Sequence, residues 1–243
     1  MRRRSGAPSL MRDVSRHDSM NVASSLAADG FAVAPAVISE ADCLAIEGQL
    51  SALDVRGAGS RNLLAAGWCE RVALQLKSAP ALITPLNGCV AFQCTYFDKS
   101  DVVNWSVPIH QDLAIPVAER VEHQELRGWS IKEGGLFVQP PATVLDNLLA
   151  VRLHLDNSDP DNGPLRVVPG SHRHGRLGDE VQSALRTEAG EVECVVGRGG
   201  VIAMKPLLLH ASAKSTSSKP RRVLHFVYGP ASLPLGLSWA RAV

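Results

Sequence analysis

Two histidines and one aspartate of this chain could together bind a metal ion. His110 and Asp112 lie two positions apart in Pro108-Ile109-His110-Gln111-Asp112, and His210 follows much later. Side chains two positions apart in a strand point to the same face, so His110 and Asp112 can reach one ion. Two imidazoles and a carboxylate make the facial triad of non-haem Fe(II) oxygenases, which leaves half of the octahedron open. The sequence therefore predicts an iron site and oxygen-activating chemistry.

Taken separately, these residues have plainer explanations. A His-x-Asp triplet often arises by chance in a polar surface strand. His210 ends the apolar run 201–209, where a lone histidine is usually a core residue with satisfied hydrogen bonds. Arg221, at the start of a later strand, is either a surface cation or a clamp for a dicarboxylate.

The elements that must position these residues change in character along the chain. Residues 1–20 are polar and aperiodic, which predicts a disordered tail before one domain over 21–243. Helices are predicted at 22–28, from the Ser39 cap to about residue 53, and at 65–77, with a short strand at 31–37 between the first two. Short β-branched and aromatic runs between Gly, Pro, Asn and Asp clusters then predict strands, at 89–97, 109–113, 147–155, 165–168, 191–196, 200–204, 208–211 and 222–228. This pattern favours a jelly roll with helices packed outside.

The segment 120–141 has no clear periodicity and contains Gly134-Gly135 and Pro140-Pro141. An irregular insertion directly after a candidate metal strand is more often a lid or a pocket wall than a linker. We therefore expect this segment to border the active site.

Composition limits the partners of the chain. Its 243 residues carry 25 basic and 24 acidic side chains, a net charge of +1, so no overall field attracts nucleic acid or an anionic membrane. Five cysteines without a Cys-x-x-Cys pair favour a reducing, cytoplasmic setting. The N-terminus lacks the apolar core of a secretory signal, and no window reaches the ~18 apolar residues of a membrane span. We expect a small-molecule substrate, while the oligomeric state stays open.

The motifs His110-Gln111-Asp112, the block 162–172 (NGPLRVVPGSH), His210-x-Ser212 and Arg221 occur together in this order. In type and spacing they resemble the phytanoyl-CoA dioxygenase family of Fe(II)/2-oxoglutarate oxygenases, from about residue 26 to residue 228. The resemblance implies a mainly β fold with flanking α-helices, the double-stranded β-helix or cupin-like jelly roll.

The resemblance also implies a reaction. Iron would be held by His110, Asp112 and His210, with 2-oxoglutarate and O2 as co-substrates. The expected activity is that of a 2-oxoglutarate-dependent non-haem iron dioxygenase, which hydroxylates an unactivated C–H bond of a small metabolite and releases succinate and CO2. Halogenating relatives replace the carboxylate ligand with a small residue, so Asp112 favours hydroxylation.

By the same resemblance, five further residues would bind ligands. Arg221 would bind the distal carboxylate of 2-oxoglutarate with the help of Ser212, and Lys99 and Gln111 occupy places near that co-substrate in relatives. Gln93 lies where related ectoine hydroxylases place a glutamine that contacts substrate.

One strand departs from the family pattern. Where relatives often carry an aromatic or small residue facing the co-substrate, this chain has Arg152, with His154 on the same face. The two residues either contact an anionic ligand in the pocket, with Arg152 a candidate co-substrate contact, or face solvent. Ser171, His172 and His174 are expected to be turn and surface residues.

Two other classes of protein remain open at this stage. One is a jelly-roll binding module without catalysis, and the other is a metal cupin or zinc hydrolase that does not use 2-oxoglutarate. The pair Arg221 and Lys99 separates them from an oxygenase, because a hydrolase does not need a clamp for a dicarboxylate.

Overall fold

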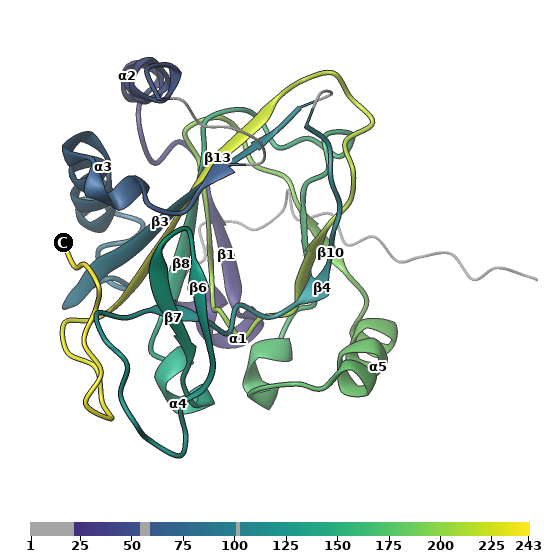
Figure 1. Ribbon diagram of the computed structural model, residues 1–243. Helices are drawn as coiled ribbons and strands as arrows, with labels where there is room; N and C mark the ends of the chain where they lie inside the picture. Colours follow the sequence, from purple (N-terminus) through teal and green to yellow (C-terminus); the bar gives the residue numbers. More distant parts are fainter. Residues whose placement is uncertain (1–21, 54–58, 101–102) are drawn as a thin grey trace, which may run out of the picture.

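Two antiparallel β-sheets face each other in the computed structural model, which describes residues 22–53, 59–100 and 103–243 (Figure 1). Within these residues the larger sheet has the strand order β1-β11-β8-β13-β3-β2 and the smaller sheet the order β10-β9-β12-β4. The strands of the larger sheet are β1 (Phe31–Ala34), β2 (Gly59–Ser60), β3 (Cys89–Lys99), β8 (Leu149–His154), β11 (Val201–Met204) and β13 (Arg221–Pro230). Those of the smaller sheet are β4 (Val107–His110), β9 (Leu165–Val167), β10 (Val192–Cys194) and β12 (His210–Ser212). The predicted jelly roll is confirmed.

Both faces of the larger sheet are covered, which explains why its strands contain so few exposed residues. On β8, Leu149, Val151 and Leu153 pack outward into a core shared with the helices, whereas Ala150 faces the other way and packs between the sheets. The same alternation on β13 sends Leu224, Phe226 and Tyr228 outward. The inward face of these strands is therefore where polar side chains can form a binding or catalytic site.

Helices cover the outer face of the larger sheet, with α2 and α3 beside β3 and β13 in Figure 1. The helical segments are α1 (Val22–Asp29), α2 (Glu40–Ser51), α3 (Gly67–Ser78), α4 (Ala142–Leu145), α5 (Asp179–Ala189), and the 3-10 turns η2 (Leu63–Ala65) and η3 (Ser171–His174). The predicted cap of α2 is confirmed: the Ser39 hydroxyl accepts the Asp42 N–H, and the Asp42 carboxylate accepts the Ser39 N–H. No helix in the described residues is long and apolar enough to cross a membrane.

A third, smaller sheet includes much of the segment 120–141, so the prediction of an irregular backbone there is wrong, while the expectation that the segment borders the active site is a separate one. The strands β5 (Ile115–Pro116), β6 (Arg127–Lys132) and β7 (Gly135–Gln139) form it, in the order β5-β7-β6. The turn between β6 and β7 places Gly134 at φ 78°, a left-handed conformation that glycine adopts without a steric penalty. The segment is thus largely an ordered β-hairpin.

Other boundaries differ in detail. The strand predicted at 109–113 is β4 and ends at His110, so Asp112 follows the strand rather than lying within it. Helix α5, which the sequence analysis does not predict, has no buried residue. The predicted tail, 1–20, lies outside the described residues.

Candidate active site

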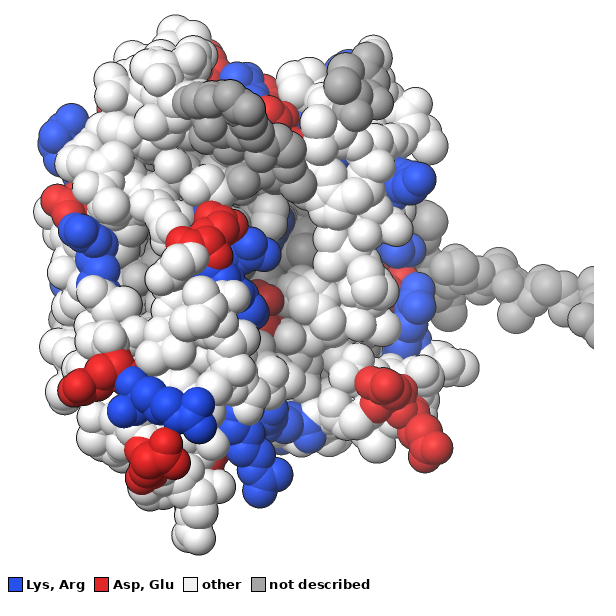
Figure 2. All heavy atoms as spheres, in the orientation of Figure 1, with Lys and Arg blue, Asp and Glu red and all other residues white. Residues whose placement is uncertain are grey.

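A cavity of about 630 Å³ opens between the two sheets and contains all three predicted metal ligands. Figure 2 shows a hollow in this face of the molecule, with basic and acidic side chains at its edge. Its apolar wall comes from all three sheets and the segments beside them, and includes Phe92, Phe97, Ile115, Phe137, Leu145, Leu148 and Val227. The volume suits a small organic ligand.

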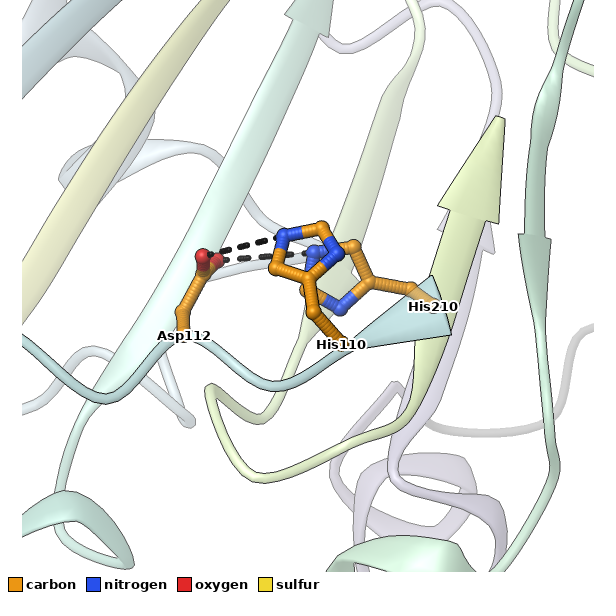
Figure 3. Close-up of side chains that lie close together, drawn as sticks. All are labelled: His110, Asp112 and His210. Carbon is orange, nitrogen blue, oxygen red and sulfur yellow. Dashed lines mark ion pairs between the residues drawn. The ribbon is translucent and has the colours of Figure 1, made fainter. Parts of the chain in front are cut away.

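The register of the smaller sheet brings the predicted metal ligands together (Figure 3). His110 on β4 lies directly opposite His210 on β12, and their ring centroids are 4.2 Å apart. Asp112 is held just beyond β4 because its N–H donates to the carbonyl of Pro206. The Asp112 carboxylate oxygens lie 3.7 Å from Nε2 of His110 and 3.7 Å from Nε2 of His210. One ligand atom from each residue lies within 4.8 Å of the others.

Backbone contacts select the tautomer of each histidine. Nδ1 of His110 lies 2.9 Å from the carbonyl oxygen of Pro108, and Nδ1 of His210 lies 2.9 Å from that of Leu208. A carbonyl only accepts, so each Nδ1 carries the proton and each Nε2 keeps a lone pair directed toward Asp112. Burial lowers the pKa of His210 to about 4, which keeps this ring neutral near pH 7. The donor set fits a divalent transition metal with open coordination positions.

A group of cations lies deeper in the same interior. Arg221 and Lys99 are cross-strand partners on β13 and β3 and are only 4% and 1% exposed. Lys99 Nζ donates to Ser212 Oγ at 2.8 Å and to the carbonyl of Ala213 at 2.6 Å, which ties the larger sheet to β12. Arg221 Nε donates to the carbonyl of Asn162 at 3.2 Å, whereas its Nη1 is buried without a partner.

Among the described residues, no carboxylate forms an ion pair with Arg221, Lys99 or the nearby Arg152. Burial, followed by the nearby charges of Arg221 and Arg152, lowers the pKa of Lys99 to about 8. Burial, followed by the charge of Arg152, lowers the pKa of Arg221 to about 9. Like charges on directly opposite strand positions repel, so an anion bound between these side chains would stabilise them.

The turn Asn162-Gly163-Pro164 has a specific task in this arrangement. Asn162 is buried, and its side chain bonds to the backbone at Asn157 and Asp159 while its carbonyl accepts from Arg221. Gly163 has φ 68°, and a Cβ there would collide with the Ala213 carbonyl and lie 3.2 Å from Lys99 Nζ. The glycine therefore allows the turn to approach the cation pair.

Gln111 and Ser171 have roles that the sequence analysis does not assign. Gln111 Nε2 donates to the carbonyls of Gly175 and Leu207, and its Oε1 accepts the N–H of Leu177. Backbone groups thus occupy most of this amide and let Gln111 hold the loop beside the site, while its expected co-substrate contact stays a prediction. Ser171 is buried and accepts the N–H of Leu209, next to His210.

The expectation that Ser171 and His172 lie at the surface is wrong, because both are buried; His174 is exposed. Gln93 lines the cavity and donates to Thr95 Oγ1 at 3.1 Å. Its predicted contact with substrate stays a prediction.

Arg152 and His154 do not face solvent, which excludes that alternative. Arg152 is 8% exposed and lines the cavity, and His154 is fully buried with neither ring nitrogen hydrogen-bonded in the described residues. His225, which the sequence analysis overlooks, lies opposite Arg152 in the β8–β13 register, and its Nε2 is 3.9 Å from Asp112 Oδ2. Alternate residues of a strand share one face, so an inward-facing Arg221 predicts that residues 223 and 225 also face inward. This pattern could have identified His225.

The mouth of the cavity is closed on one side by the β6–β7 hairpin. Glu133 in its turn pairs with Arg61 at 2.7 Å and also accepts the Arg61 N–H, while Asn62 Nδ2 donates to the Glu133 carbonyl. Arg221 and the metal ligand His210 are each 4% exposed, whereas the Asp112 side chain is 40% and the Arg61 side chain 46% exposed. The cavity therefore has a buried polar part and a more exposed side.

Comparison with known proteins agrees with this arrangement. The sequence model of the phytanoyl-CoA dioxygenase family matches residues 26–223. No curated protein matches the sequence.

Among solved structures, apo EctD from S. alaskensis is similar with a TM-score of 0.65 and 17% identity over 93% of this chain and 82% of that one. HygX from Streptomyces hygroscopicus, with nickel and 2-oxoglutarate bound, has a TM-score of 0.59 and 17% identity over 90% and 88%. The alpha-ketoglutarate-dependent epimerase SnoN from nogalamycin biosynthesis has a TM-score of 0.65 and 16% identity over 90% and 87%. At these identities the likeness establishes the fold.

Proposed function

The chain belongs to the phytanoyl-CoA dioxygenase family of non-haem iron, 2-oxoglutarate-dependent oxygenases, and from that premise we propose that it hydroxylates an unactivated C–H bond of a small molecule. The observation that carries the proposal is the pairing of two features in one cavity. An open set of metal ligands, His110, Asp112 and His210, lies beside a buried cation pair that forms no ion pair among the described residues. A metal hydrolase or a binding module would need only one of these features.

Each group of residues has a defined task in this proposal. His110, Asp112 and His210 hold Fe(II), which supplies the oxygen-activating chemistry when 2-oxoglutarate and O2 are bound. Arg221 and Lys99, with the Ser212 hydroxyl, bind the distal carboxylate of 2-oxoglutarate by charge-assisted hydrogen bonds. The apolar wall of the cavity orients the substrate and excludes water.

Anaerobic titration tests the binding part of the proposal. Apo-protein is loaded with Fe(II) and then titrated with 2-oxoglutarate, while the visible metal-to-ligand charge-transfer band is followed. We expect the band in wild type and its loss in His210→Ala, because that substitution removes a metal ligand. A well-folded, iron-loaded wild type that gives no band contradicts the proposal.

Isotope labelling tests the reaction itself. In air, wild type is expected to convert 2-oxoglutarate to succinate, and candidate small molecules that accelerate this conversion are analysed by mass spectrometry under ¹⁸O₂. Incorporation of one labelled oxygen atom supports hydroxylation. If the substrate is consumed, or inverted at one carbon, without gaining oxygen, the result is consistent with iron and 2-oxoglutarate chemistry but contradicts hydroxylation.

A further inference from the structure

A second polar group lies on the inward face of the larger sheet and has no task in holding either the metal or the distal carboxylate. Arg152 on β8 and His225 on β13 are cross-strand partners, and both line the cavity. Arg152 Nη1 lies 3.1 Å from His225 Nδ1, and Arg152 Nε is buried without a partner in the described residues. The guanidinium is held in position with hydrogen-bonding capacity left unused.

The hydrogen bond between them fixes the state of the pair. A guanidinium only donates, so Nδ1 of His225 is the acceptor and its Nε2 carries the proton. That Nε2 points toward Asp112 Oδ2, 3.9 Å away. The ring is therefore a neutral bridge, and the pair carries one positive charge close to the metal ligands.

The balance of buried charge requires an anion beyond 2-oxoglutarate. The two charges of a divalent metal cancel the two charges of 2-oxoglutarate. The buried cations Lys99, Arg152 and Arg221 then remain opposed within the described part of the cavity by the single carboxylate of Asp112, because the nearby Glu133 is paired with Arg61. An unpaired charge in an interior is costly, so a further anionic group is expected there in the working complex.

We propose that Arg152, positioned by His225, binds an anionic group of the primary substrate, so that the substrate class is a small carboxylic acid, or a comparable anion, with an apolar body. This inference rests on the proposed function. The Arg152 guanidinium carbon lies 5.3 Å from the centre of the Phe97 ring, which supports one face of the cation and leaves its N–H edge for a ligand. The apolar wall formed by Phe92, Leu148 and Val227 suits the remainder of such a molecule.

A carboxylate on Arg152 has one other possible source, the metal-binding end of 2-oxoglutarate itself. The test therefore compares four proteins: wild type, Arg152→Gln, Arg221→Gln, and Lys132→Gln as a matched control that removes a cavity cation at the rim. Each is loaded with Fe(II) and 2-oxoglutarate without oxygen. The dissociation constant of 2-oxoglutarate is measured from the charge-transfer band.

Straight-chain and phenyl-substituted alkanoic acids of four to ten carbons, each with its primary amide, are then titrated by calorimetry. We expect wild type to bind its best acid at least about 10-fold more tightly than the matching amide, as one charge-assisted contact provides. Arg152→Gln is expected to abolish this preference while keeping 2-oxoglutarate affinity within about 3-fold, and Lys132→Gln to keep both. A purely structural role for Arg152 would not change the ratio of acid to amide.

Three results would overturn the assignment. The first is equal binding of acids and amides by wild type, and the second is an unchanged preference in Arg152→Gln. The third is a loss of 2-oxoglutarate affinity in Arg152→Gln as large as that in Arg221→Gln, which would assign Arg152 to the co-substrate. If Arg152→Gln does not fold, Arg152→Lys keeps a charge and must keep the preference. Absence of the band in wild type refutes the proposed function instead, and the acid-to-amide ratio is then measured on metal-free protein.

Discussion

Arg221 and Arg222 are neighbours of the same residue type on opposite faces of β13, and exchanging each for glutamine should have opposite consequences. Arg221 faces the cavity, and its Nη1 has no partner in the described residues. Arg222 faces outward and binds Asp156 through two nitrogens at 2.8 and 2.7 Å and Glu47 at 2.6 Å. Substituting these two residues one at a time therefore tests ligand binding and protein stability separately within one strand.

The magnitudes follow from the contacts. Replacing a guanidinium that binds a carboxylate through two N–H groups by an amide costs about 3 kcal/mol of binding free energy. Arg221→Gln should therefore raise the dissociation constant of 2-oxoglutarate about 100-fold. Its ligand-free Tm should not fall, because a buried cation with a single carbonyl partner is removed. Arg222→Gln removes the guanidinium that binds Asp156, while Glu47 keeps Arg198, at a cost of about 2 kcal/mol, and should lower Tm by about 4–8 °C.

The assays are anaerobic titration of the Fe(II) protein with 2-oxoglutarate and thermal unfolding of the ligand-free protein. Arg222→Gln is the control for the first assay and should bind 2-oxoglutarate as wild type does. The reasoning is refuted if Arg221→Gln binds 2-oxoglutarate within about 3-fold of wild type, or if both substitutions lower affinity equally.

Three other residues give separate tests. Because burial lowers the pKa of Lys99 to about 8, 2-oxoglutarate affinity should decline as pH rises through 8 to 9, and Lys99→Met should weaken binding at pH 7 and flatten that profile in calorimetry. Stability of the ligand-free protein should depend on pH in the opposite direction. The folded state loses the Lys99 proton at a lower pH than the unfolded state does, so the free energy of unfolding measured in urea should rise as the pH increases from about 8 to the ordinary pKa of lysine. Gln111→Leu removes three hydrogen bonds to the backbone and should cost about 2–4 kcal/mol in urea denaturation, whereas a cost below about 0.5 kcal/mol would contradict its loop-holding role. Gly163→Ala should lower both Tm and 2-oxoglutarate affinity, and an unchanged affinity in a folded protein would show that the turn does not support Lys99.

The sequence was sufficient to predict features that depend on residues close together in the chain. Ser39 and Asp42 are three residues apart and satisfy each other's backbone groups, so α2 could be placed without tertiary information. The turn at Asn162-Gly163 needs a left-handed residue, and the sequence provides glycine there. The His-x-Asp spacing of residues 110 and 112 likewise reflects a local geometry, although Asp112 lies just outside its strand.

Contacts between distant segments could not be read in the same way. The β6–β7 hairpin was overlooked because Gly128 and a register shift interrupt the alternation of β6. His225 sits in an apolar run, and only pairing with β8 reveals Arg152 as its neighbour. The three backbone partners of Gln111 lie 64, 66 and 96 residues away, so no local pattern could assign them.

The difference in exposure across the cavity has a consequence for the kinetics of the enzyme. Arg221 and His210 are buried, whereas the side chains of Asp112 and Arg61 are more exposed. A ligand held by the buried Arg221 would enter from the more exposed side of the cavity, and a larger molecule seated on that side would block its exit. If 2-oxoglutarate binds at Arg221 as proposed, we expect ordered addition, with 2-oxoglutarate before the substrate and succinate leaving after the product. An inert substrate analogue should then inhibit uncompetitively with respect to 2-oxoglutarate in steady-state kinetics, since it would bind only to the complex that already contains the co-substrate, and competitive inhibition would contradict this order.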